Sequence, residues 1–415
     1  MKKLWLLLLL LVGVLTGCGG AKEDENITIK YALWDSTQAP IYRELADEFE
    51  KQNPGIKVEI ELTPFQQYWT KLEAATTGGQ MPDVIWMSAA NFEKYAINGM
   101  LLPLNENIES AGIDMANYVE GTTKLYQMDG KQYGMPKDVD SIAMWYNKEL
   151  FDKAGLEYPT NDWTWKDMKD AATKIQATLD GVYGVVLPLN DSQSSYYNVI
   201  PQNDGFVISE DKKKSGYGDP NTIEAIAMIK DLIDSKASPS YTTVVENKAN
   251  EMFQSGQVAM LYDGAWRGVE FSQNEKLNKK VGVVTMPKIK NKKTVVHGLG
   301  LVIGKTTKHP EEAWKFIEFL STKEAHEKVA KSGIVIPAYI EAQPLWAEAY
   351  TNIDVSAYVE ALKENTPYPA SLDTSKWAQV EVDELTKVWT GHSTPEEACK
   401  KIETEMDAIL AKEKK

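Results

Sequence analysis

Hydrophobic residues near the start of the chain follow two different periods. Residues 27–33 and 56–62 alternate apolar with more polar positions, which is typical of half-buried strands. Between them, Ile41, Leu45 and Phe49 recur every four residues, which predicts a helix with one apolar face. The start of the chain therefore predicts a strand, a helix and a second strand in close succession.

A third apolar run, Val84 to Met87, follows a second helical stretch after Pro64. Strands that alternate with helices at short spacing indicate an α/β fold with a parallel sheet and right-handed crossovers. Ligands of such sheets bind beyond the carboxyl ends of the strands. Six side chains that follow these strands are expected near a cleft: Trp34, Asp35, Gln66, Tyr68, Trp69 and Ser88.

The first 18 residues resemble an export signal. After Lys2 and Lys3, an apolar stretch runs from Leu4 to Leu15, shorter than the roughly 20 residues that span a bilayer. Leu15-Thr16-Gly17-Cys18 resembles a bacterial lipobox, which implies cleavage before Cys18 and a diacylglycerol on its sulfur. An ordinary signal peptide is the alternative. We therefore expect a signal peptide over residues 1–17 and a lipidated Cys18 with a flexible tether to residue 26, anchored on the extracytoplasmic face of the cell membrane.

Length and composition narrow the class of protein. With 415 residues, 43% of them hydrophobic and 25% charged, the chain is long enough for two globular domains. Its net charge of −15 makes nucleic acid an unexpected partner. If Cys18 is lipidated, Cys399 has no partner for a disulfide, so a large core has to hold the fold.

Several sequence blocks, spread over nearly the whole chain, resemble extracellular solute-binding proteins of the maltose-binding type, which feed carbohydrate ABC importers. The blocks are Asn53-Pro54-Gly55-Ile56-Lys57-Val58, Pro82-Asp83-Val84-Ile85, Gly134-Met135-Pro136, Met144-Trp145-Tyr146-Asn147-Lys148, Phe253-Gln254-Ser255-Gly256-Gln257-Val258-Ala259-Met260, Asp263-Gly264-Ala265-Trp266 and Pro310-Glu311-Glu312-Ala313-Trp314-Lys315-Phe316. Each block alone is weak, but their order and spacing are specific.

This resemblance implies a two-lobe periplasmic-binding-protein-like fold of type 2, in which each lobe is a mixed sheet flanked by helices. The chain would cross between lobes near Lys137 to Asp140, Gly298 to Gly300, and Ile334 to Pro337. One lobe would hold residues 27–138 with 299–334, and the other 139–298 with 335–415. Such a cleft closes on its solute by hinge motion.

A sugar site needs aromatic faces for C–H patches, and planar polar groups for hydroxyls. The chain has 12 Trp and 19 Tyr, although many aromatic residues in any protein are core residues. The resemblance implies that Trp266, beside Asp263, stacks on sugar, and that Asp140 accepts sugar hydroxyls, with a hinge or salt-bridge role as the alternative. The remaining expected ligand residues are Tyr196, Tyr197, His297, Gly298 and Trp377.

One block departs from the family pattern. Ser88-Ala89-Ala90-Asn91 stands where maltose-binding proteins have an Asp and an Arg that contact the sugar. The sequence therefore leaves the identity of the sugar open.

Two alternatives to sugar capture remain. A secreted glycosidase would also use paired carboxylates and aromatic residues, but Gly-x-Ser-x-Gly and His-Glu-x-x-His motifs are missing from the sequence. The same fold could bind a polyamine, a ferric ion or an oligopeptide. The four histidines lack metal-ligand spacing, so no metal and no cofactor are expected. We expect a monomeric, non-enzymatic binding protein that hands a carbohydrate to the permease subunits of an ABC importer.

Overall fold

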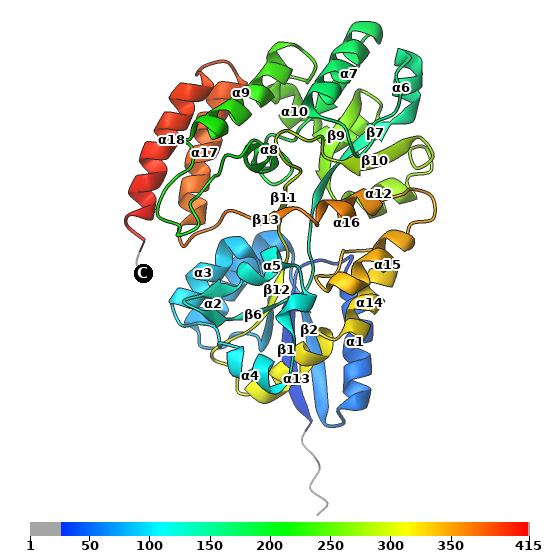
Figure 1. Ribbon diagram of the computed structural model, residues 1–415. Coiled ribbons are helices and arrows are strands. Elements are labelled where there is room, and N and C mark those ends of the chain that lie inside the picture. The colour runs from blue at the N-terminus through cyan, green and yellow to red at the C-terminus, as the bar shows by residue number, and fades with distance from the viewer. Residues whose placement is uncertain (1–25, 414–415) are drawn as a thin grey trace, which may run out of the picture.

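The computed structural model describes residues 26–413, so the predicted signal peptide and Cys18 lie outside the described residues. Two α/β halves are stacked on one another and meet at a narrow waist (Figure 1). We call residues 27–136, 300–333 and 339–348 the first half, and residues 142–296 and 356–413 the second half. The waist comprises segments 137–141, 297–299 and 334–338.

The first half is built on a five-stranded mixed sheet of order β2-β1-β3-β12-β6. Its strands are β1 (Ile27–Leu33), β2 (Ile56–Leu62), β3 (Val84–Met87), β6 (Gly134–Pro136) and β12 (Gly300–Ile303). β1 pairs in parallel with β2 and β3, whereas β12 is antiparallel to β3 and β6. The parallel part follows from the crossovers that the sequence predicts, and β12 returns from the second half to complete the sheet.

Helices cover both faces of this sheet. The apolar face of α1 (Ala39–Gln52) packs with α13 (Pro310–Leu320) and α14 (Lys323–Lys331) on one face, and α2 (Phe65–Thr77) and α3 (Ala89–Ile97) cover the other. Shorter elements complete this half: α4 (Asn105–Ser110), η1 (Met115–Asn117), α5 (Glu120–Lys124), the β4–β5 hairpin (Gln127–Met128 and Lys131–Gln132), η2 (Ile340–Ala342) and α15 (Gln343–Glu348). Ile41, Leu45 and Phe49 are buried in this core, as their spacing predicts.

The second half is built on a four-stranded mixed sheet of order β10-β7-β9-β8. Its strands are β7 (Ile142–Asn147), β8 (Tyr183–Val186), β9 (Val258–Gly264) and β10 (Val281–Thr285), and β11 (Thr294–Val296) pairs separately with β13 (Asn365–Pro367). The helices are α6 (Lys148–Ala154), α7 (Trp165–Thr178), α8 (Tyr196–Gln202), α9 (Pro220–Asp234), α10 (Tyr241–Asn247), α11 (Ala249–Gln254), α12 (Arg267–Gln273), α16 (Ser356–Ala361), α17 (Thr374–Trp389) and α18 (Pro395–Leu410). The expected α/β fold with two mixed sheets flanked by helices is confirmed.

Three chain segments lie side by side at the waist. The backbone N–H of Lys137 donates to the carbonyl of Leu299 (2.8 Å), and that of Asp140 donates to the carbonyl of His297 (2.6 Å). Val139 N–H donates to the carbonyl of Ile336 (3.0 Å). These bonds tie the waist segments together, so the two halves are joined by hydrogen-bonded stretches of chain.

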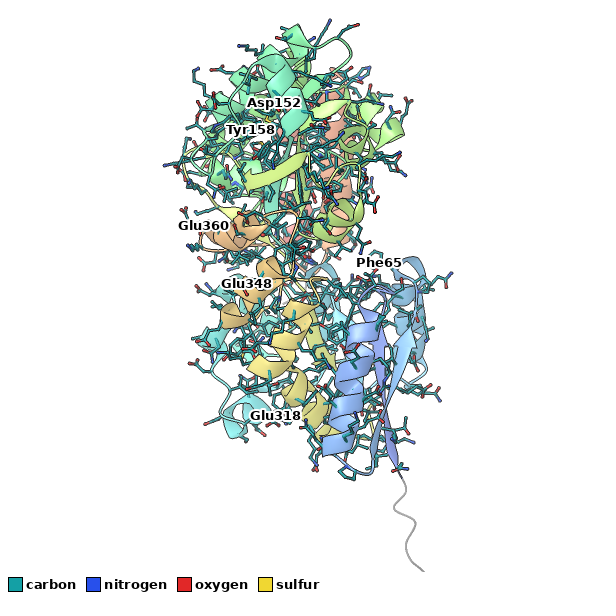
Figure 2. The ribbon with its side chains drawn as sticks, turned by 90° about the vertical axis from the view of Figure 1, so that its right-hand side faces the viewer. Phe65, Asp152, Tyr158, Glu318, Glu348 and Glu360 are labelled. Carbon is teal, nitrogen blue, oxygen red and sulfur yellow. The ribbon has the colours of Figure 1, made fainter. Side chains whose placement is uncertain are left out.

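The last passage between the halves runs through several short elements. Residues 334–338 touch the waist, and η2 and α15 then pack on α14 of the first half. The chain continues from Glu348, below the waist, to Glu360, above it (Figure 2). Trp346 of α15 is buried, its indole N–H donates to the carbonyl of Gly333 (3.1 Å), and its ring packs against Tyr358 of the second half, so the boundary expected at residue 335 stays a prediction.

Candidate functional site

A cavity of about 670 Å³ lies where the two halves meet the waist. Five of the predicted site residues line it: Trp34, Asp35, Asp140, Trp266 and His297. The remaining lining residues are Thr37, Gln38, Asp138, Ala265, Val269, Glu270, Gln273, Leu299, Ile334, Val335 and Ile336. Both halves contribute, so a ligand in this cavity would contact both.

Trp34 forms the aromatic wall of the first half. It directly follows β1 and is half-buried, with its ring held edge-to-face by Tyr68 (centroids 4.8 Å apart) and Phe65 (5.6 Å). The buried Tyr68 hydroxyl donates to the carbonyls of Ala32 and Trp86, and Trp69 packs beside Trp34. Tyr68 and Trp69 therefore support Trp34 and do not line the cavity themselves.

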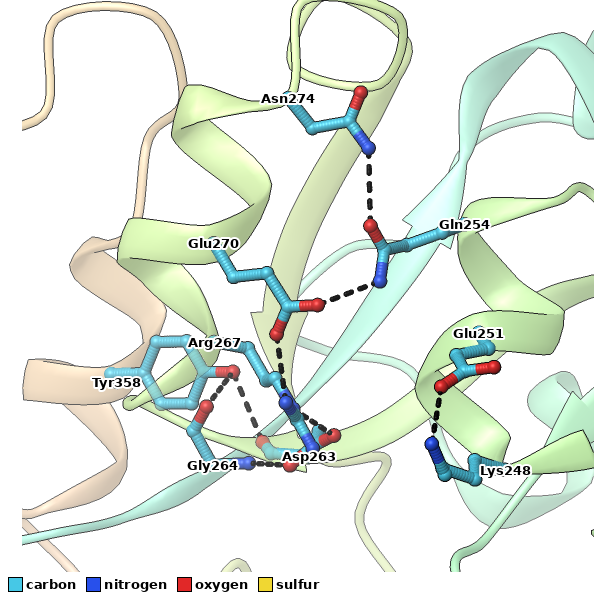
Figure 3. Close-up of polar contacts among 9 residues, drawn as sticks. All are labelled: Lys248, Glu251, Gln254, Asp263, Gly264, Arg267, Glu270, Asn274 and Tyr358. Atoms are coloured by element: carbon cyan, nitrogen blue, oxygen red, sulfur yellow. Dashed lines mark hydrogen bonds and ion pairs between the residues drawn. The ribbon is translucent and has the colours of Figure 1, made fainter.

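Trp266 forms the opposing wall, from the loop between β9 and α12. Figure 3 shows the polar network that holds this loop: Arg267 Nε donates to the Asp263 carboxylate (2.8 Å), and Nη1 donates to Glu270 (2.7 Å). The Tyr358 hydroxyl donates to the carbonyls of Asp263 (3.0 Å) and Gly264 (3.1 Å). The chain is thereby fixed on both sides of Trp266.

Asp263, a predicted ligand residue, is engaged by the protein and is not among the residues that line this cavity. Its carboxylate is buried, accepts from Arg267 and from the N–H of Gly264 (2.8 Å), and does not line the cavity. Burial raises the pKa of Asp263 to about 6, against the opposing charge of Arg267. Asp263 positions the Trp266 loop.

A buried charge cluster lies beneath the cavity at the waist. The Lys137 ammonium forms an ion pair with Asp138, donates to Gln38 Oε1 (2.8 Å) and lies 4.1 Å from the centroid of the Trp86 ring. Asp138 also accepts from the backbone N–H of Leu299 (2.6 Å). Lys137 is thus satisfied by a carboxylate, an amide and an aromatic face, as a buried cation requires.

Asp140 faces this cavity without a protein partner. Within residues 26–413, its carboxyl makes no hydrogen bond or ion pair. Burial, reinforced by the nearby charge of Asp138, raises its pKa to about 8 against the opposing effect of Lys137. Burial lowers the pKa of His297 to about 4, so this imidazole is neutral at pH 7. The cavity therefore presents two polar groups that are largely uncharged and available to a ligand.

Several predicted ligand residues lie elsewhere. Trp377 is fully buried in the core of the second half, with its indole N–H donating to Ser371 Oγ (2.8 Å), so its ring does not line the cavity and its stacking role stays a prediction. Tyr196 and Tyr197 are also core residues, and the hydroxyl of Tyr197 donates to Glu381 (2.7 Å). These rings lack a free face.

Ser88 and Gly298 have structural roles. Ser88 is buried at the N-cap of α3, and its hydroxyl accepts from Asn91 (3.1 Å). Gly298 passes so close to the waist that an added Cβ would lie 2.2 Å from the carbonyl oxygen of Asp138. Neither lines the cavity, and Gln66 belongs to α2.

Sequence reasoning missed two groups of lining residues. Val269, Glu270 and Gln273 lie on the face of α12 that continues from Trp266, and their helical spacing after that residue was a usable signal. Gln38 and Asp138 gave no such signal, because their role depends on Lys137 reaching across from another element.

Three further observations concern the rest of the described residues. A second large cavity, of about 710 Å³, lies between Tyr118 and α16, but Asp140 and the two tryptophans do not line it. Residues 26–413 bring together no group of three His, Cys, Asp or Glu side chains suited to a metal ion. In the same range, no helix combines the length and apolar character needed to cross a membrane.

Comparison with known proteins assigns the chain to a family. Residues 34–327 match the family described as bacterial extracellular solute-binding protein. The chain belongs to this family. This solute-binding protein is 25% identical over 334 residues to the arabinooligosaccharide-binding protein of Bacillus subtilis, a match that covers 78% of this chain and 76% of the relative.

Two further similar proteins are named for the sugars that they bind. This solute-binding protein is 26% identical over 362 residues to the maltooligosaccharide ABC transporter solute-binding lipoprotein of Streptococcus pneumoniae, covering 84% of this chain and 80% of the relative. Among solved structures, the ABC substrate-binding protein of Listeria monocytogenes in complex with cycloalternan superposes with a TM-score of 0.81. It is 31% identical and covers 93% of this chain and 99% of its own.

Proposed function

We propose that this protein captures a sugar or oligosaccharide between its two halves and delivers it to an ABC-type importer. The observation that carries the proposal is the cavity that Trp34 and Trp266 line from opposite halves. The carboxyl of Asp140, which has no protein partner among residues 26–413, lines the same cavity. Aromatic faces with a few directed polar groups suit a pyranose. Similarity to the arabinooligosaccharide- and maltooligosaccharide-binding relatives and to the protein in complex with cycloalternan supports this ligand class.

The waist provides the hinge on which the proposed ligand capture depends. The two halves, with boundaries near residues 137–141 and 297–299, act as lobes that close by hinge motion at the extended waist segments. A ligand that contacts Trp34 and Trp266 stabilises the closed form, because the open form cannot offer both contacts at once. The closed protein then presents a changed surface to the permease.

A polyamine is the alternative that one observation favours, since carboxylates of Asp35, Asp138, Asp140 and Glu270 line the same cavity. Most of them are already engaged. Asp138 pairs with Lys137, Glu270 accepts from Arg267, and Asp35 accepts from the N–H of Thr37 (2.7 Å). The cavity therefore suits a neutral, hydroxyl-rich ligand better than a polycation.

Anchoring completes the proposed function. Cleavage before Cys18 and lipidation of its sulfur would hold the protein at the outer face of the membrane beside the importer. The lipobox-like Leu15-Thr16-Gly17-Cys18 supports this step, as does similarity to the pneumococcal relative, which is itself a lipoprotein. Metabolic labelling with a fatty-acid analogue tests it: label is expected in the full chain and lost in Cys18→Ala.

Ligand capture is tested on protein that starts at residue 19. Mono- and oligosaccharides, with spermidine as the polyamine control, are screened by thermal shift and tryptophan fluorescence. A saccharide that raises the melting temperature and lowers the radius of gyration in X-ray scattering supports the proposal. Stabilisation by spermidine alone, or turnover of a chromogenic glycoside, contradicts it.

A further inference from the structure

A short turn of the second half reaches the first half. Ile208 and Ser215 pair as an antiparallel bridge, and the N–H of Ser209 donates to the carbonyl of Lys214 (2.9 Å). The N–H of Ser215 donates to Asp407 in α18 (2.6 Å), which anchors the turn to the second half. Lys212 lies in the turn with a φ of 57°, so its backbone adopts the left-handed conformation.

Lys212 forms an ion pair with Glu93 of α3 in the first half. This ion pair joins the two halves as defined above. The Glu93 side chain is 15% exposed and that of Lys212 45%, so the pair is partly shielded from solvent. Shielding strengthens a charge interaction that would contribute little on an open surface.

A second pair of opposite charges lies beside the first. Lys124, in α5 of the first half, and Glu210, in the turn, line the same cavity of about 520 Å³ as Glu93 and Lys212. Glu120 raises the pKa of Lys124 most, through their ion pair, and the charge of Glu210 adds to that effect. Glu93 of the first half thus pairs with Lys212 of the turn, and Lys124, which is paired with Glu120, also feels the opposite charge of Glu210 across the gap.

This charged cavity adjoins the ligand cavity. Tyr368 lines the charged cavity and His297 lines the ligand cavity, and their rings are 5.1 Å apart. Closure about the waist, as proposed above, would form the contacts at the turn and bring Trp266 toward Trp34.

We propose that the turn at residues 208–215 is an electrostatic latch, in which Lys212 with Glu93, aided by Glu210 with Lys124, holds the two halves closed and raises ligand affinity. The latch rests on the proposed closure about the waist, but not on the identity of the ligand. By favouring the closed form it lowers the apparent dissociation constant, since ligand then encounters more of the binding-competent state.

Charge reversal tests the latch without any ligand. Spin labels on Lys51→Cys in α1 and Lys174→Cys in α7 report the distance between the halves by pulsed electron paramagnetic resonance. Cys399 stays unlabelled because it is fully buried and burial raises the pKa of its thiol to about 12. The spin-labelled protein is compared with labelled variants that also carry Glu93→Lys, Lys212→Glu, or both. Lys214→Glu is the matched control, with the same charge change at an exposed position of the same turn.

We expect a closed population in the unliganded protein that shrinks about three- to tenfold in each single variant and returns in the double swap. Raising the salt from 0.05 to about 1 M should open the wild type and leave the single variants unchanged. Equal distances in all variants, failure of the swap to restore closure, or an equal effect of Lys214→Glu would overturn the latch. If Glu93→Lys fails to fold, Lys212→Ala makes the same comparison from the exposed side.

Different results would contradict the proposed function and the latch. A distance distribution that responds to the charges, with no saccharide bound in the screen, supports the latch and contradicts sugar capture. Saccharide binding with an affinity unaffected by Lys212→Glu contradicts the latch and leaves sugar capture supported.

Discussion

The indole ring of Trp266 lies directly against Gly264, two residues earlier in the chain. A Cβ on Gly264 would come 2.2 Å from the ring carbons, closer than any real contact. Gly264 ends β9, and the absence of its side chain lets the ring lie against the strand while Trp266 also lines the ligand cavity. The place of the aromatic wall therefore depends on a glycine that does not line the cavity.

Gly264→Ala is expected to displace the Trp266 ring and weaken ligand binding by about 2 kcal/mol, as does Trp266→Ala. Isothermal titration with a saccharide that stabilises the wild type measures both. Because both variants remove the same contact, the double variant should lose no more than Trp266→Ala alone. Additive losses would mean that Gly264 acts through something other than the ring.

Trp163 and Trp377 provide a contrast with Trp266. Trp377→Ala is expected to lower the free energy of unfolding by roughly 3–5 kcal/mol, because it removes a fully buried indole and its bond to Ser371. Trp163, which packs against its own half, should lose less stability on substitution by Ala. Urea unfolding checks both changes, and titration should show ligand affinity preserved in Trp163→Ala.

The strands of the first sheet were predictable from sequence, and the roles of the aromatic residues were not. β1 and β2 have the predicted bounds. Successive side chains of a strand point to opposite faces, so a half-buried strand alternates apolar and polar residues in the sequence. Trp34 could be placed near a cleft because it follows a strand, and Trp266 because the resemblance puts a stacking aromatic residue there. Trp377 also follows a loop, and its burial depends on Ser371 and on packing between α17 and α18 that no local pattern records.

Charges at the waist were only partly predictable. Asp140 could be placed because the resemblance puts a carboxylate at the first crossing. The pairing of Lys137 with Asp138 and Gln38 needs three side chains from two elements to converge, and neither spacing nor composition shows this. The ion pair between Glu93 and Lys212 could not be predicted from spacing or composition either, because the two residues are 119 positions apart in the sequence.

Ligand affinity is expected to rise with pH near 8 through Asp140. Its raised pKa means that the carboxyl is mostly protonated at pH 7 and ionises as the pH passes about 8. A carboxylate accepts stronger hydrogen bonds from sugar hydroxyls than a neutral acid does. Titrations from pH 6 to 9 should show affinity increasing about three- to tenfold in the wild type and staying constant in Asp140→Asn. A flat wild-type profile would contradict this role for Asp140.

Glu381 is expected to make stability fall as the pH rises. It is fully buried, one carboxyl oxygen accepts from Tyr197 (2.7 Å), and the other has no partner among residues 26–413. Burial raises its pKa from 4.5 to about 8. Between these values the folded chain holds a proton that the unfolded chain has released, so stability is lost as the pH climbs through this window.

Glu381→Gln removes that titration while keeping the size and the hydrogen-bonding capacity of the side chain. Between pH 5 and 8, wild-type stability should fall by roughly 3 kcal/mol relative to the variant, measured by urea unfolding at both pH values. Glu384 on the same helix is the control: although burial opposes them, Lys387 and Lys401 lower its pKa, so Glu384→Gln should cost stability at both pH values without changing the slope. Parallel pH profiles for the wild type and Glu381→Gln would show that Glu381 is ionised in the folded protein, which would require an ion or solvent to reach its second oxygen.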